Sequence, residues 1–231
     1  ISRINEALGE PTEETARGDL ANVTRLIDTL DEIYQHAEKA VVEDTDELIS
    51  LLKVGEEPKQ TCQRYKNGNV YYNKCLLAYV VDANKKLLEI KKDHTIVARS
   101  IIKFTPIEHE GNLIPGILME KMYNRAAKPV NFRAGIRHLI KKARKVGAKV
   151  IVVPLKTIQE FSEGEVVKIM KEEAKSAKAK FGKGEVKITF LKSKNDFEYS
   201  DSRGSAGAGA IIDWKGKRKT AYRLTTYVIE V

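Results

Sequence analysis

The sequence predicts an α/β (α+β) protein with a mixed, mainly antiparallel central sheet of six to seven strands flanked by helices. Three observations predict it: short apolar runs separated by turn residues fill residues 75–123, a basic amphipathic helix and a buried strand follow in 131–153, and an acidic helical pattern precedes both. With 231 residues, 42% of them apolar, the chain can bury one good core.

Charge is divided unevenly along the chain. Residues 1–60 hold 6 Lys and Arg against 15 Asp and Glu, a net charge of −9, and the other residues hold 35 against 17, a net charge of +18. A body this basic attracts phosphates, other polyanions or an acidic partner, including the N-terminal segment itself. We expect an acidic helical segment at 1–57, an α/β core at 58–199, and a Gly/Ala-rich loop with a C-terminal hairpin at 200–231.

Composition also limits the compartment and the class of protein. No apolar run reaches the roughly 18 residues that a membrane span needs, so we expect a soluble, cytoplasmic protein with no membrane partner. Abundant Lys and Glu with only two cysteines are typical of thermophile proteins. The chain opens on Ile1 rather than Met, so it is open whether it belongs to a larger polypeptide or complex.

The elements follow from periodicity. Helix spacing covers 19–37, and a shorter helix is expected at 45–53, before Gly55. We expect strands at 75–81, 86–91 and 95–104, a loop at 105–112, and a strand at 114–123.

A helix, a glycine and a buried strand come next. Ile136, Leu139, Ile140, Ala143 and Val146 form one stripe, with Asn131 as the expected N-cap and Gly147 as the C-terminal stop. The strand 150–153, ended by Pro154, is expected to lie parallel to its neighbour. A helix around Val166–Ala174, a strand at 186–191, a mobile loop at 200–210, and a hairpin of 211–214 with 222–231 complete the order.

The order of elements in 76–191 resembles the GNAT superfamily of acyl-CoA-dependent N-acyltransferases. Two phrases carry the resemblance: "LLEIKKDHTIVARSIIKF" is similar to that family's paired central strands, and "GILMEKMYNRAAKPVNFRAGIRHLIKKARKVGAKVIVV" to its strand, pyrophosphate loop, helix and strand. The resemblance implies a GNAT-like fold, an acyl-CoA cofactor such as acetyl-CoA, and an amine as acyl acceptor. "FRAGIRH" would be the pyrophosphate loop, with Arg137 where the family has a second small residue.

The cofactor residues implied by this loop are Arg133, Ala134, Gly135, Ile136 and Arg137. The physical basis is independent of the family, because a helix N-terminus carries free N–H groups and partial positive charge that bind anions. Gly135 would permit close backbone approach, and the two arginines would add full charges. The alternative is a solvated basic helix that binds nothing.

Residues for proton transfer are expected near that loop. The related enzymes often use a Glu, or a water, to deprotonate the amine, and Glu120 among apolar neighbours is the candidate base. The alternative for Glu120 is pairing with Lys121, Arg99 or another cation. In the related enzymes a Tyr on the later helix can protonate the leaving thiolate, but residues 156–179 contain no tyrosine. Tyr123 and Tyr199 are substitutes by proximity; the alternative is that they are packing residues.

Cys62 opens a separate hypothesis. With His94 or His109 as base, it could act as a nucleophile. Alternatively it could form a disulfide with Cys75, or both could be plain thiols. Two cysteines and four histidines make no recognised metal-ligand spacing, so no metal is expected.

Nucleic-acid binding is the rival function. In this interpretation the chain is a non-catalytic module of a larger protein that binds RNA or DNA through its basic surface. The candidate phosphate contacts are Lys141, Arg144, Lys145, Lys215, Lys217, Arg218 and Lys219. A Lys-rich surface that only solvates the protein is the simpler reading.

Overall fold

The structure is a computed structural model that describes residues 40–61, 64–65, 76, 79–125, 128–155, 161–189 and 221–231. The chain separates into two compact units, Ile1–Ala40 and Val41–Val231, and the second unit contains the sheet. The predicted helix 19–37, loop 200–210 and strand 211–214 lie outside the described residues, as do residues 215–219.

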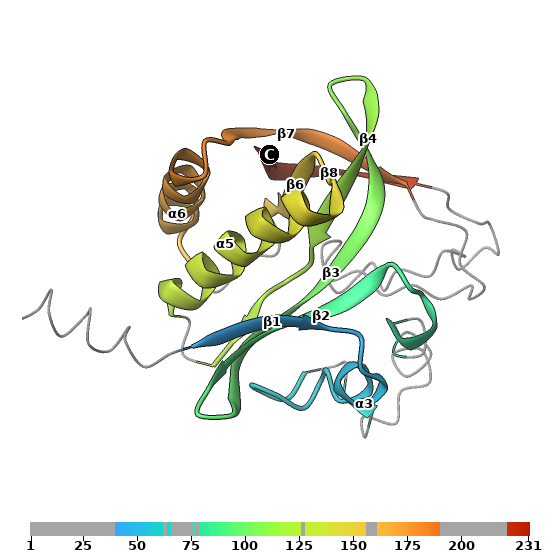
Figure 1. The fold of residues 1–231 in the computed structure, drawn as a ribbon, viewed down its shortest axis with the longest axis vertical. Coiled ribbons are helices and arrows are strands. Elements are labelled where there is room, and N and C mark those ends of the chain that lie inside the picture. Colours follow the sequence, from blue (N-terminus) through green and yellow to red (C-terminus); the bar gives the residue numbers. More distant parts are fainter. Residues whose placement is uncertain are drawn as a thin grey trace, which may run out of the picture. The chain divides into compact units, whose positions relative to one another are not determined.

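The second unit is a mixed sheet with helices, which confirms the predicted fold class (Figure 1). The strands join in the order β1-β2-β3-β4-β6-β8-β7, and β5 pairs with β3, so the described residues form a sheet of eight strands rather than six or seven. Among the described pairings, β4 with β6 is parallel and all others are antiparallel. The elements are β1 Val41–Thr45, α3 Leu48–Leu52, β2 Lys85–Lys92, β3 Thr95–His109, β4 Asn112–Met119, β5 Tyr123–Asn124, α5 Pro129–Val146, β6 Val150–Pro154, α6 Glu163–Ser176, β7 Lys180–Thr189 and β8 Ala221–Glu230.

Two predictions for the N-terminal half are wrong. Val41–Thr45, placed in the helical segment 1–57, is the strand β1, because it pairs with β2 from Val41 to Thr45. Residues 79–81, expected in a strand, are helical. Leu76 and Tyr79 lie three positions apart and both join the buried cluster around Leu51 and Leu87, which is the spacing of a helix face.

The predicted loop 105–112 is also wrong. β3 runs on to His109, and β4 starts at Asn112 with Ile107 opposite Ile114. Only Glu110 and Gly111 form the turn, and both have positive φ, 50° and 80°. Two successive positive φ values are typical of a tight hairpin turn, so the hairpin needs no longer loop.

Five strands close into a ring. β3, β4, β6, β8 and β7 pair in succession, and β7 returns to β3 through Ile107–Ile188 and Glu108–Lys187. Each of the five contributes to one buried apolar cluster, made of Ile107, Leu118, Val150, Val152, Val186, Ile188 and Val228. The ring is therefore a packed core rather than a channel.

Helices cover the sheet on both faces. On one face α5 packs on β2, β4 and β6, and α6 packs on α5, β7 and β8; both helices share one buried cluster with Leu88, Ile102 and Ile117. On the other, Leu51 of α3 and Tyr79 pack on Leu87 and Ile101. Adjacent strand residues thus point to opposite faces, as the pleat requires. Across the described residues, no helix has the length and apolar character of a membrane span.

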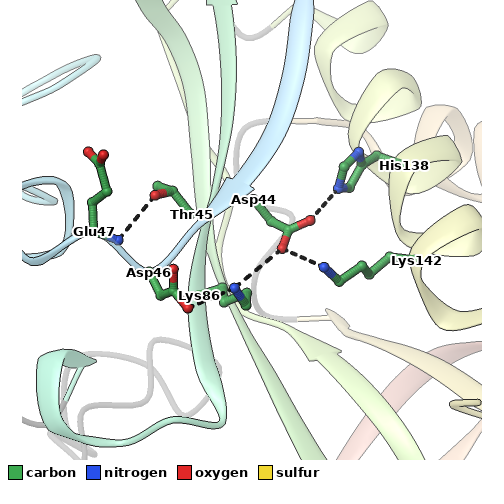
Figure 2. A network of polar contacts seen from close by, with 7 residues as sticks. All are labelled: Asp44, Thr45, Asp46, Glu47, Lys86, His138 and Lys142. Carbon is green, nitrogen blue, oxygen red and sulfur yellow. Dashed lines mark hydrogen bonds and ion pairs between the residues drawn. The ribbon is translucent and has the colours of Figure 1, made fainter. Parts of the chain in front are cut away.

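Asp44 fastens the edge strand β1 to α5 (Figure 2). Its carboxylate lies 2.8 Å from His138 Nε2 and 2.8 Å from Lys142 Nζ. Burial acts to raise the pKa of Asp44, but hydrogen bonds and charges from Lys142 and His138 outweigh it, so the pKa lies below its ordinary value. Lys86 bonds Asp46 at 2.9 Å in the same network.

Candidate active site

The hydrogen-bonded ladder between the parallel strands β4 and β6 stops before the two strands end. Their ladder runs from Gly116–Val150 to Leu118–Val152 and stops, although the strands continue to Met119 and Pro154. Proline has no N–H and cannot donate the next ladder bond, which accounts for the stop. The carboxyl ends of parallel strands are where α/β sheets bind ligands.

The N-terminus of α5 lies at the same edge, because α5 follows β4 through a short connection. The helix starts at Pro129, its N-cap Lys128 makes no side-chain cap bond, and its first turn contains no acidic residue. Arg125 and Lys128 are exposed beside it. Free N–H groups, the helix dipole and two cations make this edge attractive to an anion.

The predicted N-cap, Asn131, is wrong. Asn131 lies inside the first turn, buried, and its Nδ2 donates to Asn124 Oδ1 at 2.9 Å. Asn124 in turn donates to the Lys128 carbonyl at 2.9 Å. These two asparagines tie the connection to the helix start. Sequence reasoning missed Asn124 because its partners come from the folded loop.

The sequence predicted that residues 133–137 open the helix, and this is wrong. They lie in the second turn of α5 and at the start of its third turn. Arg133 bonds Glu172 at 2.6 Å and Glu173 at 3.1 Å, and Arg137 bonds Glu173 through Nε and Nη2, each at 2.9 Å. Both arginines thus join α5 to α6. Their role in cofactor binding stays a prediction.

The three residues between the arginines pack toward the sheet. Ile136 is fully buried and Ala134 borders the same core cluster. A Cβ added to Gly135 would lie 2.9 Å from Met122 Cε and 3.4 Å from Leu88 Cδ2. Glycine here therefore permits close packing of α5 on the sheet.

Glu120 follows β4 directly and is held at three points. Its Oε1 lies 2.8 Å from Lys103 Nζ, and the two side chains are only 1% and 2% exposed. Its N–H donates to the Ile101 carbonyl at 2.9 Å, and its own carbonyl accepts from Ser100 Oγ at 2.8 Å. The structure thus pairs Glu120 with a cation, Lys103, that the sequence analysis did not name.

Other buried charges share this face of β2 and β3. Lys85 lies opposite Lys103 in register and bonds Asp82 at 2.5 Å. Glu89 lies opposite Arg99, and all four side chains of these two register pairs are 1–2% exposed. Burying charges costs free energy even when they are paired, so such a row is more typical of a functional site than of a stabilising one.

Tyr123 and Cys62 have different outcomes. The Arg99 guanidinium lies 4.3 Å from the centroid of the Tyr123 ring, and Tyr123 is 7% exposed. Its packing on Arg99 is clear, whereas its role as an acid stays a prediction. Cys62, Cys75 and Tyr199 lie outside the described residues.

The candidate nucleic-acid residues are described in part. Lys141, Arg144 and Lys145 are exposed on α5, and Arg144 donates to the Ala177 carbonyl at the end of α6. Lys215, Lys217, Arg218 and Lys219 lie outside the described residues. The contact with phosphate stays a prediction.

One group in the described residues has metal-ligand chemistry. His109, Glu110 and Glu230 place ligand atoms within 4.8 Å of one another. Lys180 Nζ lies 3.1 Å and 3.4 Å from the Glu230 oxygens, so an ammonium already neutralises that carboxylate. We assign no metal to this group.

Comparison with known proteins gives structural matches only. No family model matches the chain, and no curated protein does. An acetyltransferase from Bacillus subtilis in complex with CoA is 11% identical over 84% of this chain and 99% of its own, with a TM-score of 0.37. An N-acetyltransferase from Staphylococcus aureus Mu50 is 10% identical over 83% of this chain and 97% of its own, with a TM-score of 0.38.

A third match is a conserved protein from Enterococcus faecalis V583 described as a probable N-acyltransferase. It is 10% identical over 65% of this chain, with a TM-score of 0.38, and the aligned region spans 35% of its length. Two of the three are named as acetyltransferases and the third as a probable N-acyltransferase. Identities and TM-scores this low leave the function to be argued from the residues of the chain itself.

Proposed function

We propose that residues 41–231 form an acyl-CoA-dependent N-acyltransferase-like domain that transfers an acyl group to an amine. The single observation that carries the proposal is the end of the β4–β6 ladder at Leu118 and Val152, before the carboxyl ends of both strands, together with the start of α5 that follows β4. Acyl-CoA has the matching chemistry, with an extended amide-bearing arm at one end and a pyrophosphate at the other.

The arm fits between the two strands. Strand edges that lack a ladder partner expose N–H and C=O groups, and an extended chain with amide groups can pair with them as a further strand would. Met119 and Val153 are the next residues of the two strands after the last ladder pair. The thioester end of the arm would then point toward Glu120, on the face of the buried charges.

The pyrophosphate belongs at the start of α5 in this proposal. Its charge would meet the N–H of Val130, the positive end of the helix dipole, and the side chains of Arg125 and Lys128. This shifts the anion site one turn toward the N-terminus from the predicted 133–137, because Arg133 and Arg137 are bound to acidic residues of α6.

The chemistry would be direct transfer. An acceptor amine attacks the thioester carbonyl while Glu120, or a water that it holds, takes the amine proton. Backbone N–H groups of β4 and β6 beyond their last ladder pair would stabilise the negative charge that develops on the carbonyl oxygen.

Titration calorimetry with acetyl-CoA and with free CoA at moderate salt tests the proposal. The double variant Arg125→Glu/Lys128→Glu should raise the Kd at least about tenfold, the loss of about 1.4 kcal/mol. Lys141→Glu/Lys145→Glu is the matched control, since it makes the same charge change at exposed positions elsewhere on α5. Equal Kd values for both double variants, or no binding by the wild-type chain, would contradict the proposal.

A further inference from the structure

Lys103 and Glu120 form a buried ion pair that the stability of the fold does not require. The pair lies diagonally across β3 and β4, since Lys103 is opposite Leu118 and Ile101 is next to Glu120. It also lies between two apolar clusters, the one that contains Ile101 and the ring core that contains Leu118. Apolar residues of similar size would satisfy such a place at least as well.

The surroundings make the proton of Lys103 sensitive to the charge on Glu120. Lys85, also 2% exposed, is the register partner of Lys103 on β2, so two ammonium groups share one stretch of the face. Each has its own carboxylate, Asp82 for Lys85 and Glu120 for Lys103. Arg99 and Glu89 are the remaining buried charges of the row on β2 and β3. Protonation of Glu120 would remove the carboxylate charge that lies 2.8 Å from the Lys103 ammonium.

We propose that Lys103 and Glu120 act together as a proton relay for acyl transfer, with Glu120 as the base and Lys103, rather than Tyr123, as the acid. The inference rests on the proposed function. It goes beyond it by giving the leaving thiolate a proton donor and by explaining why the base is paired with a lysine rather than an arginine.

The relay balances in three steps. The acceptor nitrogen forms a bond to the thioester carbon, and Glu120 takes one proton from that nitrogen. The carbon–sulfur bond breaks, and the Lys103 ammonium gives a proton to the departing thiolate, so CoA leaves as the thiol. Glu120 then passes its proton across the 2.8 Å contact to the neutral Lys103 amine, which restores the carboxylate–ammonium pair.

The order of these steps follows from burial. An adjacent carboxylate favours the charged form of a buried amine, so the Lys103 ammonium holds its proton more tightly while Glu120 is ionised than once Glu120 is neutral. The donor is thus ready when the thiolate forms, and no proton has to enter from bulk water.

Arginine at position 103 separates this role from a structural one. Arginine keeps the positive charge and can bond Glu120, but it does not release a proton in proteins. We would compare wild type, Lys103→Arg and Lys103→Met by thiol release from acetyl-CoA, with a panel of amines and with water alone as acceptor. Lys142→Arg is the matched control, since Lys142 also pairs with a carboxylate, Asp44.

Both Lys103 variants should release thiol at least about 100-fold more slowly than wild type, while Lys142→Arg matches wild type. Melting curves and the Kd for acetyl-CoA are measured first, and rates are compared among variants that keep both. If the two variants fail to fold, Lys103→Ala with added propylamine replaces them, and the relay then requires that the free amine restores thiol release. A Lys103→Arg rate equal to wild type, or no rescue by the amine, would overturn the relay.

Two further outcomes distinguish the relay from the function beneath it. Wild-type chain that binds acetyl-CoA but releases no thiol above the rate in buffer would overturn the relay and leave the cofactor site standing. Mass spectrometry that finds an acetyl group on Lys103 would also overturn it, because Lys103 would then be an acceptor. Absence of acetyl-CoA binding would instead remove the proposed function, and the relay with it.

Discussion

Arg137 donates two hydrogen bonds of 2.9 Å to the Glu173 carboxylate, one from Nε and one from Nη2, and so joins α5 to α6. Glu173 is 5% exposed, and Arg133 bonds the same carboxylate. Burial acts to raise the pKa of Glu173, but the hydrogen bonds and charges of the two arginines hold it below its ordinary value. The arginines of the predicted pyrophosphate loop therefore have a structural task.

Glu173→Gln should destabilise the protein by about 1–2 kcal/mol, because a buried charge-assisted contact is lost while the Arg137 guanidinium stays largely solvated. Urea denaturation measures this. Acetyl-CoA binding should change little in the same variant.

The paired arginine change is the counterpart. Arg133→Gln/Arg137→Gln should lower stability by a similar or larger amount and leave the Kd for acetyl-CoA within about threefold of wild type, since only long-range charge is removed. A large rise in Kd with unchanged stability would restore 133–137 as the anion site.

Asp44 makes stability depend on pH in the acid range. Its pKa is lowered from 3.8 in the folded state, so it contributes stability that is present above pH 3.8 and is lost as the pH falls through the folded value. Asp44→Asn should cost about 1–2 kcal/mol at pH 7, and the difference from wild type should shrink below pH 3.8. Urea midpoints of both proteins at pH 7 and near pH 3 measure it; a constant difference would show that Asp44 does not act through its charge.

Alanine should destabilise the protein at Gly116 and be tolerated at Gly135. A Cβ at Gly116 would clash with Ile107 Cδ1 and lie 2.9 Å from Val150 Cγ2, inside the ring, so Gly116→Ala should destabilise by about 1–3 kcal/mol. At Gly135 the near atom is the mobile end of Met122, and alanine favours the helix by about 1 kcal/mol, so the net change should be under about 1 kcal/mol. Thermal melts of both variants decide, and equal losses would mean that the two sites are equally tight.

Nucleic-acid binding has its own test. If the exposed residues Lys141, Arg144 and Lys145 bind phosphate, affinity for RNA or DNA should fall steeply with salt, and the triple Glu variant should reduce both the affinity and the slope of its logarithm against that of salt. The acyltransferase account expects weak binding at most. Fluorescence polarisation across a salt series separates the two, and tight binding that the triple variant removes would favour the alternative.

Local signals in the sequence predicted the elements that position the site. The stripe Ile136–Leu139–Ile140–Ala143 predicted α5, and Gly147, with φ 75°, ends it as expected. The apolar run before Pro154 predicted β6. The strand β1 was missed because VVEDT is acidic and short, and its partner lies on β2.

The contacts that matter most to the site could not be predicted locally. The Lys103–Glu120 pair depends on the register of β3 against β4, and the closing of the ring depends on β7 reaching β3 from far along the chain. Arg133 and Arg137 looked like ligand residues because their partners belong to another helix, α6. Single-sequence patterns contain neither register nor helix-to-helix distance.

The most direct test of where the cofactor binds is hydrogen–deuterium exchange with and without acetyl-CoA. We expect slower exchange at 119–121 and 153–155, where β4 and β6 end, and at 128–132, where α5 begins. Exchange in the ring core should change little. Protection confined to 133–137 and α6, or none at a saturating concentration of acetyl-CoA, would contradict it.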